Sequence, residues 1–339
     1  MSLSVSPIPY DLIGAGNPIM DLLARVPDDF LTHHVSGAKG GMELVNADEM
    51  HRLVSQLHAS PVRAPGGSAA NTTISAARLG LRTRYLGKIG DDETARTYHQ
   101  NMLDHGVDGS CFKRGALPNA RCLSLVTPDS QRTLRTCLGA AMTISPDEVS
   151  VDDFSSSRHA HIEGYLMFNP ALATAVVNAA RAAGCTISID LSSFEVVNVA
   201  RDWLTAQIKE GINIIFANED EIHALYQTKT SDFEALAKQL AAQGCLAAVK
   251  MGKDGAWLAR GQEVHRILPI RVTQLVDTTG AGDAWAAGFL YGYLRGWTLP
   301  AAGALGSILG AECVQHLGPA IPESHWPEIK QRAVLLGSR

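Results

Sequence analysis

The stretch Asp277-Thr-Thr-Gly-Ala-Gly-Asp283 decides how the rest of this chain is interpreted. It lies between a strand-like run, Ile270 to Val276, and an apolar helical run from Ala284 to Leu294. Its glycines allow close approach of the backbone, and the first amides of the following helix lack internal partners, so together they can bind phosphate. Asp283 adds a carboxylate there, which predicts phosphoryl transfer to a hydroxyl that this base aligns. The alternative is an ordinary helix start with an acidic first turn.

Length, composition and charge restrict the class of protein. The chain has 339 residues, of which 46% are hydrophobic, enough for one large α/β domain with or without a smaller appendage. Its net charge of −5, without a basic run, argues against nucleic acid as the main partner. The six cysteines are scattered without C-x-x-C spacing, which argues against a zinc site or a disulfide framework. Met1–Pro9 lack the pattern of a signal peptide, and the apolar runs are shorter than the roughly 20 residues of a membrane span. We therefore expect a soluble, cytoplasmic protein without a membrane partner.

Two segments in the first quarter of the chain place polar groups beside glycines. Asn17 and Asp21 follow a short buried strand that ends at Gly16, where an amide and a carboxylate can bind two substrate hydroxyls; turn chemistry at Asn-Pro is the alternative. Gly67 and Asn71 lie at the start of a small-residue helix, where the alternative is a plain glycine-rich loop. Neither segment is a dinucleotide fingerprint, a P-loop or a nucleophile elbow, because each lacks a required residue.

Strand patterns at distant positions predict a small second sheet. Leu22–Val26, Ala120–Val126 and Gln131–Leu138 read as strands, and Thr127-Pro-Asp-Ser130 between the last two is a β-turn signal. We expect these strands to form a lid on the main domain. Residues 9–16, 46–113 and 139–335 would then form the large α/β domain, and residues 17–45 and 114–138 the small β lid.

From Ser157 onward, short apolar strands alternate with helical patterns, as at His159–Glu163, Thr186–Asp190 and Ile212–Ala217. This alternation predicts a doubly wound, mostly parallel sheet with helices on both faces. Ligands of such sheets bind beyond the carboxyl ends of the strands. Four polar residues fall at or just after these ends: Glu163, Asp190, Asn218 and Asp277.

Asn218 and Glu221 begin the helix that follows one of these strands. An Asn N-cap with Glu three residues later is a capping box. The same pair can position a hydrated Mg²⁺ ion, which takes few protein ligands, and the two interpretations are compatible. Further along, Gly252-Lys-Asp-Gly255 is a hairpin turn whose glycines can also face nucleotide phosphates.

Together these segments resemble a known family. Asp277 to Asp283 resembles the C-terminal signature of the ribokinase-type (PfkB-like) sugar and nucleoside kinases, and Asn218-x-x-Glu221 is similar to their N-x-x-E motif. Pro65-Gly-Gly-Ser-Ala-Ala-Asn71 with Gly87-Lys-Ile-Gly-Asp-Asp92 looks like their N-terminal signature. Four stretches look most like the bacterial adenosine-kinase-like branch: Gly16-Asn-Pro-Ile-Met-Asp21, Arg132-Thr-Leu-Arg-Thr-Cys-Leu-Gly-Ala140, Ile162-Glu-Gly-Tyr-Leu166 and Phe216-Ala-Asn-Glu219.

The resemblance implies a ribokinase-like α/β domain with a β-sheet lid that transfers the γ-phosphate of ATP to a primary alcohol. By position, Asp283 would be the base, and the amides of Gly280, Ala281 and Gly282 would form the anion hole. The substrate hydroxyls would bind Asn17, Asp21, Gly67, Asn71 and Glu163. Mg²⁺ and the nucleotide would bind Asn218, Glu221, Lys250, Gly252 and Gly255, with Glu221 holding the metal through water and Lys250 standing where many relatives have Thr.

The resemblance also implies a monovalent cation, K⁺, at Asp277 and Thr279 with backbone near Cys313 and Gly318, and a homodimer through the lid sheets. The favoured acceptor is the ribose of an adenosine-like nucleoside, and a ribokinase- or fructokinase-like sugar kinase is the alternative within the class. In another class, the alternative is a non-catalytic nucleotide or sugar sensor. Such a sensor would have lost the base or the anion-hole glycines, which this chain keeps.

Overall fold

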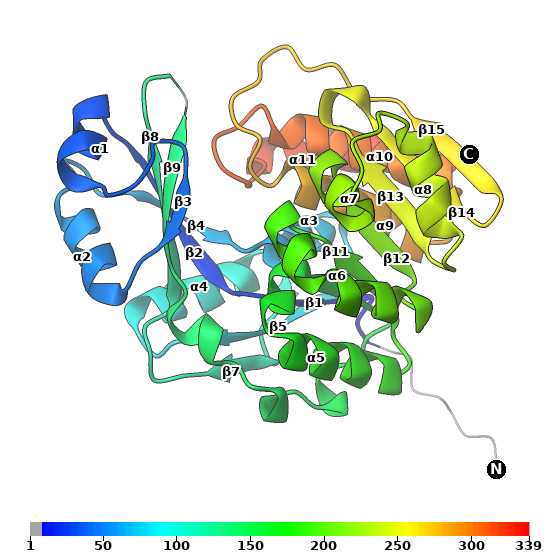
Figure 1. Cartoon of the computed structure of the whole chain (residues 1–339), viewed down its shortest axis with the longest axis horizontal. Coiled ribbons are helices and arrows are strands. Elements are labelled where there is room, and N and C mark those ends of the chain that lie inside the picture. Colours follow the sequence, from blue (N-terminus) through cyan, green and yellow to red (C-terminus); the bar gives the residue numbers. More distant parts are fainter. Residues whose placement is uncertain (1–8, 130, 339) are drawn as a thin grey trace.

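The computed structural model describes residues 9–129 and 131–338. Met1–Ile8 and Ser130 lie outside the described residues. The expected absence of a signal peptide depends on the first of these segments, and the expected β-turn includes Ser130. The chain forms a large sheet covered by helices and a small sheet that projects from it, on the left in Figure 1. This arrangement confirms the predicted α/β class with a second, smaller sheet.

The large sheet runs in the order β15-β14-β13-β12-β11-β10-β1-β5-β6, and β7 also pairs with β5. All pairs from β6 to β13 are parallel, whereas β14 and β15 form an antiparallel edge. The order reverses between β1 and β10, the point at which open α/β sheets bind ligands. The strands are β1 (Leu12–Ala15), β5 (Thr83–Ile89), β6 (Val107–Asp108), β7 (Phe112–Arg114), β10 (His159–Glu163), β11 (Thr186–Asp190), β12 (Ile214–Ala217), β13 (Leu246–Lys250), β14 (Ala256–Arg260) and β15 (Glu263–Ile267).

Helices bury both faces of this sheet, which explains why strands such as β12 are apolar along their whole length. One core contains Val176, Leu204 and Leu240 from the helices of one face, and the other contains Phe289 and Leu305. The first face carries α5 (Pro170–Ala182), α6 (Phe194–Lys209), α7 (Glu219–Tyr226) and α8 (Phe233–Ala241); the second carries α3 (Ser68–Leu79), α9 (Ala281–Leu294), α10 (Leu299–Cys313) and α11 (Trp326–Gly337). No helix among the described residues has both the length and the apolar character needed to cross a membrane.

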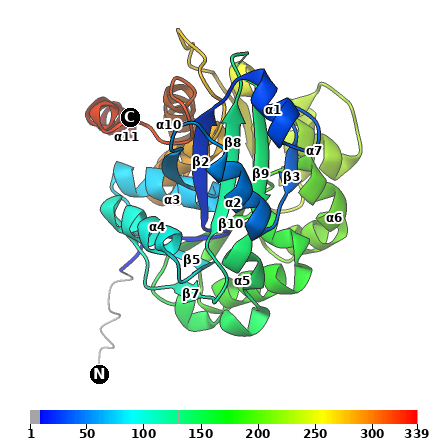
Figure 2. The same cartoon turned by 90° about the vertical axis from the view of Figure 1, so that its left-hand side faces the viewer.

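The small sheet has the order β3-β9-β8-β2-β4 and faces the viewer in Figure 2. Side chains on β2 alternate: Met20 and Leu22 enter a core beneath α1 and α2, whereas Asp21 and Leu23 point into a cleft. The elements are β2 (Ile19–Arg25), α1 (Asp28–His34), β3 (Met42–Leu44), α2 (Ala47–Ser55), β4 (Val62–Gly66), β8 (Ala120–Val126) and β9 (Arg132–Cys137), with α4 (Glu93–Asp104) at its base. We call this sheet with α1 and α2 the lid.

The expected hairpin and its partner are confirmed, because β8 pairs antiparallel with β9 and parallel with β2. The segment 46–113, expected in the large domain, contains β4, which pairs with β2. We therefore propose that the lid also includes residues 46–66.

The prediction of a strand at Ile270–Val276 is wrong. The sheet ends with β15, Pro269 follows, and residues 268–279 have irregular backbone. Proline cannot donate a ladder hydrogen bond, and the chain here turns away from the sheet edge. The Val276 amide donates instead to the carbonyl of Val314, at 2.8 Å, so this segment is fastened to the loop that follows α10.

Candidate active site

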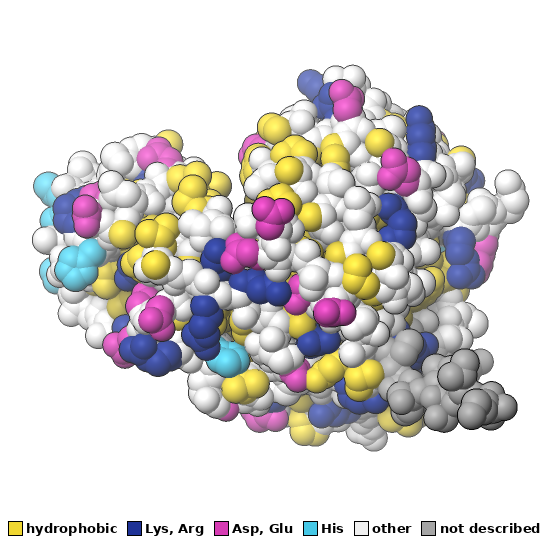
Figure 3. Space-filling view, turned by 90° about the horizontal axis from the view of Figure 1, so that it is seen from below, with side chains coloured by type: hydrophobic (Ala, Val, Ile, Leu, Met, Phe, Trp, Pro, Cys, Tyr) yellow, Lys and Arg dark blue, Asp and Glu magenta, His cyan; other side chains and the backbone are white. Residues whose placement is uncertain are grey.

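A cleft of about 1500 Å³ lies between the lid and the carboxyl ends of the central strands. Figure 3 shows the surface hollowed between the two parts, with hydrophobic side chains on both sides of the notch. Single-ligand pockets usually measure ~300–1,000 Å³, so this cleft is large enough for two small ligands. The predicted site residues line it except Asp277, which is buried behind its wall.

Asp283 lies in the first turn of α9 and meets the start of α3. Its Oδ1 accepts a hydrogen bond from Ser68 Oγ (2.7 Å), and its Oδ2 accepts one from Asn71 Nδ2 (2.9 Å). Burial and the nearby charge of Asp190 raise the pKa of Asp283 to about 6, against the lowering effect of these two donors. The carboxylate is thus ionised at neutral pH, oriented by two donors, and more basic than an exposed Asp.

The start of α9 depends on Gly280. This residue has a left-handed backbone (φ 73°), and a β-carbon there would lie 2.5 Å from Cβ of Pro319. The amides of Gly282 and Asp283 have no helical partner one turn earlier, whereas the Ala281 amide donates to the Thr278 carbonyl at 3.3 Å. Of the predicted anion hole, the amides of Gly280 and Gly282 therefore have no acceptor among the described residues and are free to bind phosphate.

Lys250, at the end of β13, places a positive charge beside this helix start. Its Nζ donates to Asp190 Oδ2 (2.7 Å) and lies 3.1 Å from where a β-carbon on Gly282 would stand. Burial opposes the charge, but the carboxylates of Asp190 and Glu221 outweigh that effect and raise the pKa of Lys250. The cleft floor thus holds a permanent ammonium next to the predicted phosphate site.

Asn218 and Glu221 form the expected capping box at the start of α7. Asn218 Oδ1 accepts from the Glu221 amide (2.9 Å), while Glu221 accepts from the Asn218 amide (2.8 Å) and from Asn218 Nδ2 (2.7 Å). Burial raises the pKa of Glu221, and the Asp190 charge adds to this effect. Both carboxylate oxygens are occupied by Asn218, so a metal ion held by this pair would be bound through water.

Glu163, at the end of β10, holds two segments of the cleft wall together. Its Oε1 accepts from Asn17 Nδ2 (2.9 Å), and its Oε2 accepts from the Ala69 amide (3.2 Å) near the α3 N-cap, Gly67. Burial raises the pKa of Glu163 to about 7. These contacts orient Asn17 and the start of α3, which carries Ser68 and Asn71.

Asp21 is the acidic group that the lid presents to the cleft. Burial raises its pKa to about 7, with Arg132 acting against this shift. Within the described residues, neither carboxylate oxygen of Asp21 accepts a hydrogen bond from the protein. A ligand hydroxyl is thus the natural partner for this side chain.

Asp277 organises the loop before α9. Its Oδ1 accepts from the amide (3.0 Å) and the hydroxyl (2.8 Å) of Thr279, and its Oδ2 accepts from the Gly318 amide (2.8 Å). Arg132 Nη1 from the lid lies 3.2 Å from the same Oδ2. The carboxylate therefore joins three segments: the loop of residues 277–280 before α9, which we call the anion loop, the loop after α10, and the lid.

Gly252 and Gly255 lie in a short 3-10 turn after β13 and line the cleft beside Lys250. The polar cleft residues to which the sequence analysis gave no role include Ser68, Arg132 and Asp190. Asp190 was visible as a carboxylate at a strand end, and Ser68 lies inside the glycine-rich motif. Arg132 offered no local signal for its ion pair with Asp277.

Comparison with known proteins agrees with this geometry. The family model described as pfkB family carbohydrate kinase matches residues 37–326. A solved adenosine kinase from Sinorhizobium meliloti is 35% identical, with 95% of this chain and 99% of that chain covered and a TM-score of 0.83. A probable sugar kinase from Rhizobium etli is 34% identical, with 96% and 99% covered and a TM-score of 0.84. The adenosine kinase of Saccharomyces cerevisiae is 26% identical over 335 residues, with 92% of this chain and 96% of that protein covered.

Proposed function

The chain belongs to the pfkB family of carbohydrate kinases, enzymes that transfer phosphate to an alcohol group, and we propose that its acceptor is the primary hydroxyl of an adenosine-like nucleoside. ATP is the phosphate donor of such kinases, usually with Mg²⁺. The observation that carries the proposal is the position of Asp283, a carboxylate of raised pKa held by Ser68 and Asn71 at a helix start.

In the proposed reaction, Asp283 accepts the proton of the acceptor hydroxyl while the oxygen attacks the terminal phosphorus of ATP. The bond from this phosphorus to the bridging oxygen breaks, and ADP leaves with the electron pair. The amide of Gly282 and the ammonium of Lys250 stabilise the negative charge on the transferred group. These donors are in place before the substrates bind, and electrostatic stabilisation is most effective when the stabilising groups need no rearrangement during the reaction. Lys250 keeps its contact with Asp190, 2.7 Å away, and donates another of its three N–H groups to the phosphate.

The acidic groups of the cleft fit Mg²⁺. Asp190 and Glu221 are buried carboxylates that line the cleft beside Lys250, and carboxylate oxygens are preferred ligands of this ion. We propose that Glu221 and Asn218 hold the ion through water, because their own atoms are occupied with each other. When bound, Mg²⁺ would neutralise charge on the ATP phosphates.

We propose that Asp21 and Asn17 bind the two secondary hydroxyls of the ribose. The Asp21 carboxylate has no hydrogen-bond donor among the described side chains and amides, and Asn17 is oriented by Glu163. Gly67 and Asn71 lie between these residues and Asp283, where the primary hydroxyl would be placed. Glu163 is in this proposal a positioning residue.

The apolar lining of the cleft favours a nucleoside over a free sugar. From the lid and from helical segments of the large domain come Leu134, Leu138, Met142, Phe168 and Leu172, which line the cleft with Asp21. A sugar offers hydroxyls in every direction, and most of them would lose hydrogen bonds to water against such a surface. A flat base covers apolar side chains without that penalty. The sugar kinase alternative is supported by the probable sugar kinase from Rhizobium etli.

The test is ADP release from Mg-ATP, measured with adenosine, other nucleosides, ribose and fructose as acceptors. We expect the highest kcat/KM with adenosine or another purine nucleoside. A higher kcat/KM with a free sugar would overturn the nucleoside proposal and support the sugar kinase. If ATP binds and no acceptor is turned over, the kinase proposal fails and a sensor function is favoured.

We propose that a K⁺ ion binds at Asp277 and Thr279. Both Asp277 oxygens already accept hydrogen bonds, and Cys313 Sγ lies 3.3 Å from the Thr279 carbonyl, so an ion here would have to share these groups. ADP release in K⁺ and in tetramethylammonium buffers checks this. Equal rates would exclude a role for K⁺.

A further inference from the structure

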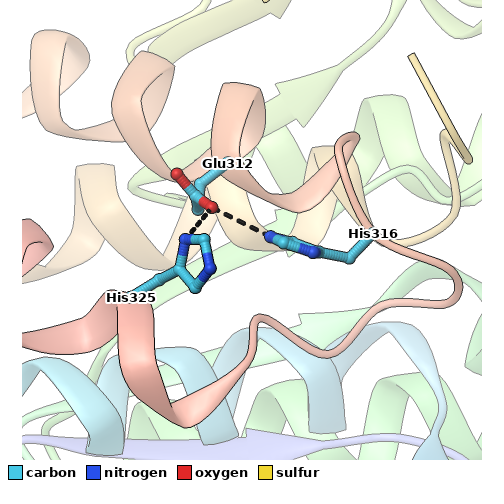
Figure 4. Close-up of side chains that lie close together, drawn as sticks. All are labelled: Glu312, His316 and His325. Atoms are coloured by element: carbon cyan, nitrogen blue, oxygen red, sulfur yellow. Dashed lines mark hydrogen bonds and ion pairs between the residues drawn. The ribbon is translucent and has the colours of Figure 1, made fainter. Parts of the chain in front are cut away.

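A cluster of three metal-ligating side chains lies outside the cleft, where α10 ends and α11 begins (Figure 4). Glu312 and His316 are one helical turn apart, and His325 precedes the first residue of α11. His316 Nε2 and His325 Nδ1 lie 2.9 Å and 2.7 Å from the same oxygen, Glu312 Oε1. The two imidazole rings are 4.9 Å apart and nearly perpendicular. None of the three residues lines the cleft.

We propose that Glu312, His316 and His325 form a binding site for a divalent transition-metal ion, with Zn²⁺ as the reference ion. Two imidazoles and one carboxylate are a common ligand set for zinc, and water fills the fourth position when only three protein ligands are present. The set suits Zn²⁺ and its first-row neighbours better than Mg²⁺ or Ca²⁺, which prefer oxygen ligands alone.

The geometry needs only a small change to hold the ion. The three ligand atoms lie within 4.8 Å of one another. Zinc bonds of ~2.0–2.1 Å in a tetrahedron place ligand atoms roughly 3.3 Å apart. The two nitrogens must therefore each move roughly 0.5 Å away from Glu312 Oε1 and up to about 1.5 Å toward one another, which side-chain rotations achieve. All three side chains keep some exposure to solvent, which leaves an entry path for the ion.

The alternative is an ion-pair cluster without a metal, in which each imidazole donates a hydrogen bond to Glu312. Two separate hydrogen bonds do not require both rings to meet at one oxygen, because a carboxylate offers two oxygens with about four lone-pair positions. What a shared ion requires is that three ligand atoms from these two elements lie close together, and the two nitrogens and Oε1 lie within 4.8 Å of one another. This convergence is the observation that favours the metal.

The site would act on the cleft through the loop between α10 and α11. His316 and His325 bracket this loop, in which Gly318 donates to Asp277 and Pro319 packs against Gly280. A metal that joins the ends of the loop restricts its motion and thereby supports the anion loop. We expect an effect on stability and a smaller effect on the reaction, since none of the ligands faces the substrates.

The experiment titrates chelator-treated, full-length protein with Zn²⁺ in competition with a chromophoric chelator, without nucleotide. We expect one ion per chain, and at least ~10-fold weaker binding in each of Glu312→Gln, His316→Gln and His325→Gln. Zinc should also raise the unfolding temperature of the wild type but not that of the variants. The matched control is His265→Gln, which removes an imidazole bonded to a single carboxylate, Glu263 (2.7 Å), and should bind zinc as the wild type does.

Circular dichroism shows whether each variant is folded. His325 is the most exposed of the three residues, so His325→Gln is the substitution least able to disturb the fold. Saturable zinc binding that the three substitutions weaken supports the site. Absence of saturable binding by the wild type, or equal binding by folded His325→Gln, overturns it. Neither result depends on the proposed acceptor, because no substrate is present.

Discussion

The two walls of the cleft differ in how their polar groups are held. On the large-domain wall, Asp283, Lys250 and Glu221 are each fixed by hydrogen bonds within the protein. On the lid wall, the Asp21 carboxylate accepts no hydrogen bond from the residues that the structure describes, and Met42 of β3 is 57% exposed at the cleft. Groups that are fixed before binding suit the stabilisation of a transition state, whereas free polar and apolar groups suit recognition of a ligand that covers them.

This difference indicates that the large-domain wall carries the catalytic groups and the lid wall carries the groups that recognise the substrate. Substitutions on the large-domain wall should lower kcat, because they remove interactions that strengthen in the transition state. Substitutions on the lid should raise KM, because they remove interactions that substrate and transition state share. The following predictions test this division, from the largest effect to the smallest.

Asp283→Asn should fold and lose at least ~100-fold in kcat, because the amide cannot accept the acceptor's proton. Steady-state ADP release measures this loss. The matched control is Asp152→Asn, the same change at an exposed position far from the helix start, which should leave kcat unchanged. A near wild-type rate for Asp283→Asn would show that Asp283 is not the base. The large-domain wall would then not differ from the lid in its part in catalysis.

Lys250→Met should lower kcat by ~10-fold or more, since it removes charge stabilisation at the phosphate. It should also destabilise the protein by ~3–5 kcal/mol, because Asp190 is left buried without its partner. The double variant Lys250→Met/Asp190→Asn removes the unpaired charge and should recover most of the stability, measured by urea unfolding. If it also recovers kcat, Lys250 serves only to neutralise Asp190.

The pH dependence follows from the pKa of Asp283, raised to about 6. Since the base must be ionised, kcat at saturating acceptor should fall about tenfold between pH 7 and pH 5, whereas kcat/KM also reflects Asp21, whose pKa burial raises to about 7. For stability the sign is opposite: the folded state favours the protonated form, so this group lowers the free energy of unfolding as pH rises through ~4 to 6. Residual activity of Asp283→Asn should lack the decrease, and its unfolding temperature relative to wild type should rise from pH 5 to pH 8.

Met42→Ser should raise KM for the nucleoside by ~3–10-fold and leave kcat nearly unchanged, because partial burial of such a side chain by a base contributes ~1 kcal/mol. Initial rates over a range of acceptor concentrations measure both constants. Leu103→Ser is the matched control, since Leu103 is 45% exposed on α4 and does not line the cleft. A lower kcat with constant KM would show that the lid takes part in the chemical step. The lid wall would then not differ from the large-domain wall in its function.

Much of the fold was predictable because its signals are local. Apolar strands alternating with helices indicated the parallel sheet, and the Asn218–Glu221 capping box was predicted from spacing and is present. The strand at Ile270–Val276 was a wrong prediction, because an apolar run has the same composition whether it joins a sheet or crosses a cleft mouth. The place of β4 was missed because Val62–Gly66 contains Pro65 and is half-exposed, which hides its strand pattern.

By itself, the sequence determined that a helix follows each glycine-rich segment, the polar residues at strand ends, and the family to which they belong; the helices begin earlier than the predicted Thr72 and Ala284, at Ser68 and Ala281. Those features depend on glycine conformation, capping and hydrophobic period, which act over a few residues. Only the tertiary structure decided that Ser68 and Asn71 orient Asp283 across more than 200 positions, and that Lys250 pairs with Asp190 beside Gly282. Such contacts arise when the sheet brings distant strand ends together, and no local pattern specifies which side chains then meet.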